Sequence, residues 1–185
     1  MTKAQLTVLA GPTAVGKGTV VAALTKRYPA LKVSVSATTR DPRPGELNGV
    51  HYYFVSPQEF DAMIERGDML EWALVHGKNK YGTPRGPVDE ALNVGNPVLL
   101  EIDLAGARQV RANRPDAQFI FLAPPSWEEL QRRLIGRGTE GPEEQARSLA
   151  TARVELEAAS EFDHVVINDD VERAVDELAR LIGLE

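Results

Sequence analysis

Short apolar runs alternate with longer amphipathic stretches along the chain, the pattern of strands connected by helices. Five runs are short and rich in Val, Leu, Ile or Phe, and they lie at Leu6–Ala10, Lys32–Ser36, Val98–Ile102, Phe119–Leu122 and Val165–Ile167. Two of them are apolar throughout, as strands buried on both faces of a parallel sheet are. The pattern therefore predicts an α/β protein with five core strands.

Polar residues mark where several helices begin. Ser56 and Ser126 are each followed three residues later by Glu, the sequence of a capping box in which Ser accepts a backbone N–H. Pro142 suits the first turn of another helix, because its missing N–H has no partner there anyway. We expect that helix to continue to about Ser160.

Two regions interrupt the simple alternation of strands and helices. Residues 37–95 contain most of the Tyr residues, a hairpin-like GVHYYFV and a short helix. This segment is longer than a single crossover connection between two parallel strands needs. Residues 126–155 carry several Arg residues around a Gly-rich corner. We predict an inserted lobe at 37–95 and a mobile flap at 126–155, with the core formed by 1–36, 96–125 and 156–185.

Composition excludes several classes of function. The chain has 185 residues, 43% hydrophobic and 26% charged, which is typical of one globular domain. It has no Cys, which excludes disulfides and thiolate chemistry. We find no membrane-spanning run and no signal peptide, so we expect a cytoplasmic protein. The net charge of −6 argues against a nucleic-acid partner, yet the first 43 residues carry seven basic residues and one acid.

A phosphate-binding loop follows the first predicted strand. It matches the pattern G-x-x-x-x-G-K between a strand and a helix, and it consists of Gly11, Pro12, Thr13, Ala14, Val15, Gly16, Lys17, Gly18 and Thr19. Its glycines allow backbone N–H groups to surround phosphate oxygens, while the helix dipole and Lys17 add positive charge. The loop predicts binding of a nucleoside triphosphate.

The loop departs from the usual motif at one position. Gly18 stands where Ser or Thr would bind Mg²⁺, and the hydroxyl comes one residue later at Thr19. Because Mg²⁺ keeps several of its waters, it could be held mainly by water and the triphosphate. The Lys-Gly-Thr run is similar to that of nucleoside monophosphate kinases. This resemblance implies phosphoryl transfer to a small acceptor rather than a switch-type GTPase, so we expect an acceptor site.

Two arginines on a Pro-rich loop are suited to that acceptor. Arg40 and Arg43 are three residues apart and can offer two guanidinium groups to one phosphate dianion. Tyr52 and Tyr81 can each add a hydroxyl donor to the same phosphate, or can instead be buried in a hairpin. We favour the phosphate role, because these aromatic residues bracket the arginine pair.

Two carboxylates end the apolar run PVLLEID. Glu101 and Asp103 are two residues apart, so both are expected on one face of a strand. They lie at the carboxyl edge of the sheet, where open α/β sheets bind ligands. We expect them to be buried and functional.

Motifs along nearly the whole chain closely resemble those of the guanylate kinases. They include the phosphate loop, SVSATTRDPRPGE, GVHYYF, LEW, YGT, LLEIDLAGA, FIFLAPPS, RRLIGRGTE and VIND. The resemblance implies a P-loop NTPase-type three-layer α/β fold with a five-stranded parallel core sheet, an inserted GMP-binding lobe and a small helical lid. It also implies ATP-dependent phosphorylation of GMP, and of dGMP, with Mg²⁺.

The resemblance assigns a guanine pocket. Glu71 and Asp103 would accept hydrogen bonds from the base edge, while Ser36 and Thr83 would serve its O6 side. Adenine would leave a buried carboxylate unpaired in such a pocket, so it would be rejected. From spacing alone, Glu71 could equally be an ordinary exposed strand residue.

The resemblance also assigns the donor side. Arg133 and Arg137 would belong to the lid, with Arg137 also against the adenine and Asn168 near it. Our own candidate for organising Mg²⁺ and its waters near Lys17 is Glu101, where related sequences often have Asp, together with Thr19. The residues expected to position the phosphates and neutralise their charge during transfer are Lys17, Arg40, Arg133 and Arg137.

One lid position differs from the family pattern. Ser148 stands where the family usually has Arg immediately before Leu. Arg147 is about 100° away around a helix, and Arg153 lies more than one turn further along. We predict that Arg147 supplies the missing phosphate contact.

Two other functions fit parts of the sequence. The same fold could phosphorylate another small acceptor such as a ribose bisphosphate, although Glu71, Asp103 and Ser36 favour guanine. It could also be a non-catalytic guanylate kinase-like module that binds phosphopeptides, but Gly16 and Lys17 of the loop are intact. We therefore expect ATP and GMP as partners, without nucleic acid or membrane. The sequence carries no signal of an oligomeric state.

Overall fold

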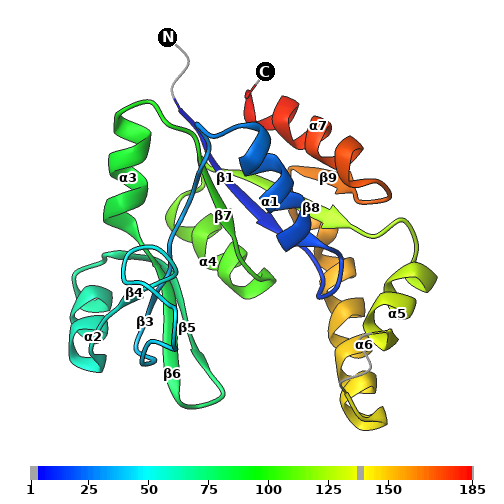
Figure 1. The fold of residues 1–185 in the computed structure, drawn as a ribbon, viewed down its shortest axis with the longest axis horizontal. Helices are drawn as coiled ribbons and strands as arrows, with labels where there is room; N and C mark the ends of the chain where they lie inside the picture. The colour runs from blue at the N-terminus through cyan, green and yellow to red at the C-terminus, as the bar shows by residue number, and fades with distance from the viewer. Residues whose placement is uncertain (1–3, 137–139, 185) are drawn as a thin grey trace.

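A parallel five-stranded sheet forms the centre of the protein, and the computed structural model describes residues 4–136 and 140–184. The strands lie in the order β2-β7-β1-β8-β9 (Figure 1). In that order they span Lys32–Val33, Val98–Glu101, Leu6–Ala10, Gln118–Ala123 and His164–Ile167. This sheet confirms the predicted α/β fold, although β2 is shorter than the run from which it was predicted.

Helices cover both faces of this sheet because its central strands are apolar on both sides. Leu9 of β1 packs with α1 (Lys17–Arg27) and α7 (Val171–Ile182). Leu6 and Val8 of the same strand pack on the other face, against α3 (Arg85–Asn93) and α4 (Leu104–Asn113). The alternation follows the two-residue period of a strand. The result is the expected three-layer arrangement.

A second, four-stranded sheet is built from residues between 37 and 84. Its order is β4-β3-β6-β5, and the strands span Tyr53–Phe54, Ala37–Thr38, Asn79–Pro84 and Met69–Val75. Helix α2 (Pro57–Glu65) buries Phe60 in a small cluster with Ala37 and Met69. The predicted hairpin in GVHYYFV was wrong, since β4 pairs with β3 in parallel.

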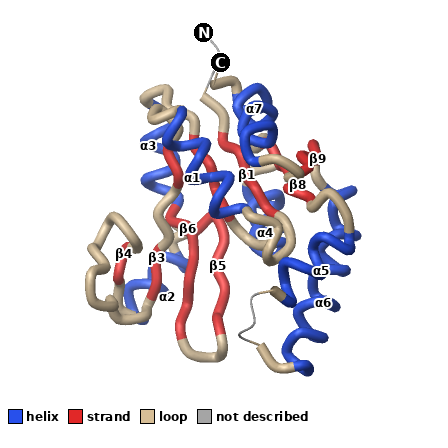
Figure 2. Tube along the Cα trace, turned by 45° about the vertical axis from the view of Figure 1, so that its right-hand side comes forward, coloured by secondary structure: helices blue, strands red, loops and turns tan. Residues whose placement is uncertain are grey.

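The hairpin of this region is instead formed by β5 and β6. Its turn contains His76 and Gly77, both with positive φ, of 52° and 66°. Lys78 completes a three-residue connection between the paired residues Val75 and Asn79, and its N–H donates to the carbonyl of Val75 at 3.1 Å. The strands then extend as the longest pair in this sheet (Figure 2).

Helices α5 (Trp127–Ile135) and α6 (Pro142–Glu157) pack on each other through Leu130, Leu134 and Ala152. The hydroxyl of Ser126 caps α5 by accepting the N–H of Glu129 at 3.1 Å, as predicted. A 3₁₀ turn, Ala158–Glu161, follows α6, which ends slightly before the expected position. Both views place this helix pair and the β5–β6 hairpin toward the same end of the core sheet.

Within the described ranges, no helix has the length and apolar character needed to cross a membrane.

Candidate functional site

The phosphate loop joins the central strand β1 to helix α1. Gly16 precedes the helix with φ of 93°, a left-handed conformation that favours glycine. The loop borders a cavity of about 570 Å³ lined by Pro12, Thr13, Ala14, Gly16, Lys17, Gly18, Thr19, Glu101 and Arg133. Gly11 and Val15 are buried behind it. The structure therefore gathers most of the predicted donor residues around one cavity.

Lys17 reaches across to the neighbouring strand end. Its Nζ donates to the carbonyl of Ile102 at 3.3 Å. Burial lowers the pKa of Lys17, whereas the charges of Glu101, Glu155 and Asp103 oppose this shift. Three carboxylates therefore act on the charge of the Lys17 ammonium, and one of them, Glu101, lines the same cavity.

The carbonyl of Val15 holds the loop from behind. It accepts a hydrogen bond from Asn168 Nδ2 at 2.7 Å and another from the Arg133 guanidinium at 3.1 Å. Asn168 follows β9 and is 4% exposed. The structure consequently gives Asn168 a contact with the loop backbone, while Arg133 both supports the loop and lines the cavity.

Glu46 fixes the position of Arg40 by hydrogen bonds, and this role of Glu46 was not predicted from the sequence. The Arg40 guanidinium makes a two-pronged pair with Glu46, at 2.9 and 3.0 Å, and Glu46 also accepts the backbone N–H of Arg43 at 2.7 Å. These bonds lower the pKa of Glu46 to about 2. An acid three residues after an arginine pair on the same loop was the available signal.

Aromatic rings complete the surroundings of Arg40. Its guanidinium lies 5.3 Å from the centre of the Tyr52 ring, which meets the Tyr81 ring edge-on at 5.9 Å. Glu46, and more weakly the hydroxyl of Tyr81, raise the pKa of Arg40. Arg43 is exposed beside them. The predicted acceptor arginine and both predicted tyrosines therefore form one cluster.

The predicted base pocket joins the two sheets. Thr83 on β6 donates its hydroxyl to Glu71 Oε1 on β5 at 2.8 Å. Asp103 caps α4 by accepting the N–H of Gly106 at 2.8 Å. A Cβ on Gly106 would lie 3.1 Å from both Asp103 Oδ1 and Glu71 Oε2, so the absence of a side chain there leaves room for both carboxylates.

Burial raises the pKa of Glu71, and the charge of Asp103 adds to this rise, whereas the Thr83 hydrogen bond opposes it. Ser36 is half-buried before β3, where its carbonyl accepts the N–H of Tyr53. Tyr81 and Thr83 are two residues apart on β6 and share a face, which connects the arginine cluster to this pocket.

Oxygen donors suitable for Mg²⁺ lie near Lys17. Glu101 and Thr19 line the donor cavity, and a carboxylate and a hydroxyl are ligands that Mg²⁺ accepts alongside phosphates and water. The expectation that Glu101 and Asp103 are buried was wrong, since both are exposed at the ends of their elements. Among residues 4–136 and 140–184, no group of three acidic, His or Cys side chains forms a ready metal cage.

The remaining lid residues are less closely placed. Arg137 lies outside the described residues. Arg147 is exposed near the start of α6, and Ser148 donates its hydroxyl to Glu140 at 3.2 Å. Arg153 stacks on the Trp127 ring at 4.2 Å, which occupies its guanidinium.

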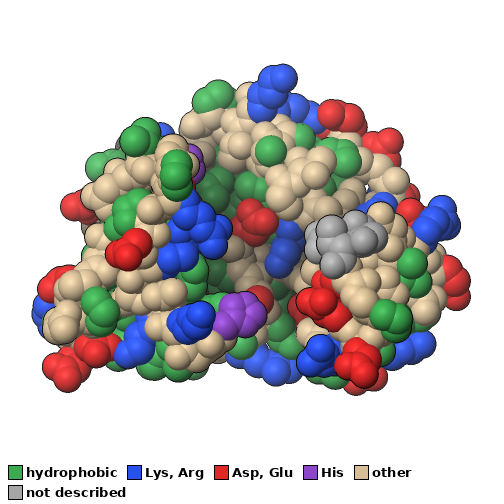
Figure 3. All heavy atoms as spheres, turned by 60° about the horizontal axis from the view of Figure 1, so that its bottom comes forward, with side chains coloured by type: hydrophobic (Ala, Val, Ile, Leu, Met, Phe, Trp, Pro, Cys, Tyr) green, Lys and Arg blue, Asp and Glu red, His purple; other side chains and the backbone are tan. Residues whose placement is uncertain are grey.

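Figure 3 shows the face that carries the site, with a hollow between two halves of the molecule. Basic side chains border this hollow, and acidic side chains are visible within it. Such a mixture suits a ligand with a phosphate at one end and hydrogen-bond donors at the other.

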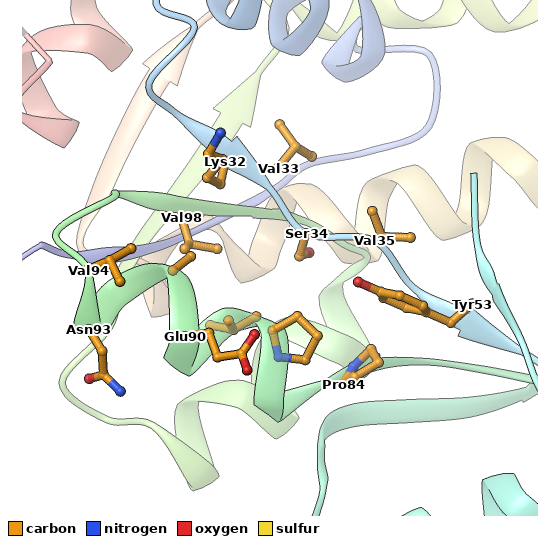
Figure 4. Close-up of a pocket in the computed structure, with 13 residues that line it drawn as sticks. Lys32, Val33, Ser34, Val35, Tyr53, Pro84, Glu90, Asn93, Val94 and Val98 are labelled. Carbon is orange, nitrogen blue, oxygen red and sulfur yellow. The ribbon is translucent and has the colours of Figure 1, made fainter. Parts of the chain in front are cut away.

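A second cavity lies elsewhere, between strand β2 and helix α3 (Figure 4). It measures about 600 Å³ and is lined mainly by aliphatic and proline side chains, including Val33, Val88 and Val98. None of the predicted site residues lines it. Its apolar walls are unsuited to phosphate groups.

A phosphate loop after the central strand, together with the polar cluster of Glu71, Thr83 and Asp103, indicates a P-loop phosphotransferase. The chain belongs to the guanylate kinase family, because the family model described as guanylate kinase matches residues 3–185. The guanylate kinase of Leifsonia xyli subsp. xyli is 61% identical over 96% of this chain and 70% of that protein. That of Thermobifida fusca is 60% identical over 97% of this chain and 91% of that protein.

Solved structures agree with this assignment. A crystal structure of guanylate kinase from Anaplasma phagocytophilum is 30% identical, with a TM-score of 0.72 over 99% of this chain and 86% of that one. Shikimate kinase from Bacteroides thetaiotaomicron is 14% identical, with a TM-score of 0.51 over 97% and 98% of the two chains. The second likeness concerns the fold alone.

Proposed function

We propose that this protein transfers the γ-phosphoryl group of ATP to GMP, and to dGMP, yielding ADP and the nucleoside diphosphate. The observation that carries the proposal is the position of Asp103 near both Glu71 and Lys17. A Cβ on Gly106 would lie 3.1 Å from both Asp103 Oδ1 and Glu71 Oε2, and Lys17 Nζ donates to the carbonyl of Ile102, the residue before Asp103. The charge of Asp103 acts both on Lys17 of the phosphate loop and on Glu71 of the base pocket. A donor phosphate and an acceptor base would therefore bind side by side.

The acceptor would be held at its two ends. Arg40, Arg43, Tyr52 and Tyr81 would bind the GMP phosphate, since guanidinium and hydroxyl groups are donors for phosphate oxygens. Glu71 and Asp103 would accept from the N1–H and amino group of guanine. On O6, Ser36 would donate, and Thr83 would have to turn from Glu71 to do the same.

The transfer needs no general base. An oxygen of the GMP phosphate attacks the γ-phosphorus while the bond from that phosphorus to the β–γ bridging oxygen breaks, leaving ADP. The protein's contribution is alignment and neutralisation of charge. We assign this to Lys17, Arg40, Arg133 and Arg137, with Asn168 supporting the loop.

Bound Mg²⁺ would neutralise charge on the donor phosphates and orient them. The residues that fit it are Glu101 and Thr19, which line the donor cavity with Lys17.

A coupled assay with ATP and Mg²⁺ tests the proposal. The acceptors to compare are GMP, dGMP, AMP, UMP and a ribose bisphosphate. We expect turnover with GMP and dGMP only, because the carboxylate pocket penalises a base that lacks the matching donors. Equal turnover of AMP and GMP would contradict the base pocket. Preference for the ribose bisphosphate, or phosphopeptide binding without any turnover, would support the alternative functions.

A further inference from the structure

Glu155 near the end of α6 reaches the phosphate loop, although no step proposed above uses it. The backbone N–H of Thr13 lies close enough to its carboxylate to lower the pKa of Glu155. Its Oε1 is buried and has no hydrogen-bond partner in the part of the chain that the structure describes. A carboxylate retained only for structure is normally satisfied at both oxygens, because an unpaired buried oxygen costs stability.

The charges around Glu155 act in opposite directions. Burial raises the pKa of Glu155, and Asp103 raises it further, while Lys17 and the N–H of Thr13 lower it. The two favourable partners, Thr13 and Lys17, both line the donor cavity. Phosphate loops use their backbone N–H groups and their lysine to bind phosphate oxygens. Glu155 therefore lies near groups that the donor phosphates would also use.

Helix α6 carries this contact to the rest of the helix pair. Leu156, next to Glu155, and Ala14 of the phosphate loop pack against the Leu130–Leu134–Ala152 cluster. Arg153 on α6 stacks on Trp127 of α5, and Arg133 on α5 donates to the loop carbonyl of Val15. A shift of α6 away from the loop would consequently change the position of an arginine in the donor cavity.

We propose that Glu155 is a positioning residue that competes with the donor phosphates for Thr13 and Lys17, so that an entering triphosphate displaces it and releases α6 from the phosphate loop. This inference rests on the proposed donor site. It makes donor binding the event that frees the helix pair carrying Arg133.

The test compares Glu155→Gln with the parent protein. Gln keeps the size of the side chain and an oxygen for the Thr13 N–H, but removes the competing negative charge. Calorimetric titration with a non-hydrolysable ATP analogue should show about fivefold to tenfold tighter binding, the scale of one removed charge interaction. GMP affinity should be unchanged. The matched control is Glu157→Gln, an exposed position on the same helix, which should bind like the parent.

The sign of the effect decides the question. If Glu155 only supports the loop, Glu155→Gln will bind the analogue as the parent does or more weakly, and the inference fails. The proposed function is judged separately, by GMP-dependent turnover of the parent. A parent that binds the analogue without phosphorylating GMP would overturn the function and leave the sign of the Glu155→Gln effect as a valid test.

Trp127 gives a second readout, because it lies against α6 and the only other tryptophan, Trp72, is on β5. In a Trp72→Phe background, saturating analogue should change the Trp127 emission. Adding Glu155→Gln should move the emission of the unliganded protein toward that of the bound one. The release of α6 would be contradicted if the analogue does not change the Trp127 emission. It would also be contradicted if Glu155→Gln leaves the emission of the unliganded protein unchanged.

Discussion

At the scale of single residues, the hydrogen bond from Thr83 to Glu71 opposes the effect of burial on the charge of the base pocket. Burial raises the pKa of Glu71, and this bond restrains the rise. Because its pKa is raised in the folded protein, Glu71 favours folding most at pH below its unfolded pKa, and this contribution is lost as pH rises through the folded value. Guanine binding has the opposite requirement, since the carboxylate must be ionised to accept from N1–H.

We expect Thr83→Val to raise the pKa of Glu71 further. The acid limb of kcat/KM for GMP should then move up by about one pH unit, the equivalent of one ordinary hydrogen bond. The measurement is a pH profile with GMP varied at saturating ATP. The pH profile with ATP varied at saturating GMP serves as the control. If the acid limb of kcat/KM for GMP lies at the same pH in Thr83→Val and in the parent protein, this role of Thr83 is contradicted.

Asn168 offers a choice between two roles, adenine contact and support of the loop. Its side chain is buried and bonded to Val15, so we expect Asn168→Ala to lower the free energy of unfolding by about 1–2 kcal/mol. The KM for ATP should rise, while the preference for ATP over GTP as donor should stay constant. Denaturant unfolding and donor kinetics measure these effects. A changed preference between ATP and GTP would show that Asn168 contacts the base of the donor nucleotide.

Contacts between distant residues were the hardest to predict. The arginine pair and the phosphate loop are local patterns, so the sequence indicated them directly. Asn168 and Val15 are 153 positions apart, and nothing in either local sequence indicates that they meet. The approach of Glu155 to Thr13 was missed for the same reason.

At the scale of elements, the first turn of α4 packs closely against the carboxylates of the base pocket. We expect Gly106→Ala to push a methyl group toward Glu71 and Asp103 and to raise the KM for GMP about tenfold, as small displacements of binding groups do. Gly86 on α3 has open space around its Cβ position, so Gly86→Ala is the matched control and should leave kinetics unchanged. Equal GMP kinetics for both variants would contradict the crowding.

Helix α6 also carries the predicted substitute for a family arginine. We expect Arg147→Ala to lower kcat several-fold, because an exposed guanidinium near the start of α6 is available to a phosphate. Steady-state assays with GMP and ATP measure this. Turnover equal to that of the parent would show that the position of Ser148 needs no compensation.

Some boundaries of helices and strands could be predicted from local sequence signals, and others could not. The capping serines located the starts of α2 and α5, because a cap depends only on neighbouring residues. The parallel pairing of β3 with β4 was not predictable, since each strand has two residues and no alternating pattern. Two-residue strands are defined by the partners that tertiary structure brings to them.

At the scale of the whole molecule, the residues assigned to ATP and GMP lie on different sheets and on the α5–α6 pair. Exclusion of water from the γ-phosphate requires these parts to approach each other. We expect small-angle scattering to show a smaller radius of gyration with GMP and an unreactive ATP analogue together than with either alone. An unchanged radius with both ligands would contradict closure.

The bond between Asn168 and the carbonyl of Val15 has a consequence for synthesis of the protein. Ribosomes produce Val15 of the phosphate loop 153 residues before Asn168, which follows β9. A nascent chain can therefore contain the complete nucleotide motif without the support behind it. The donor site should therefore mature only after Asn168 has been synthesised and β9 has joined the sheet.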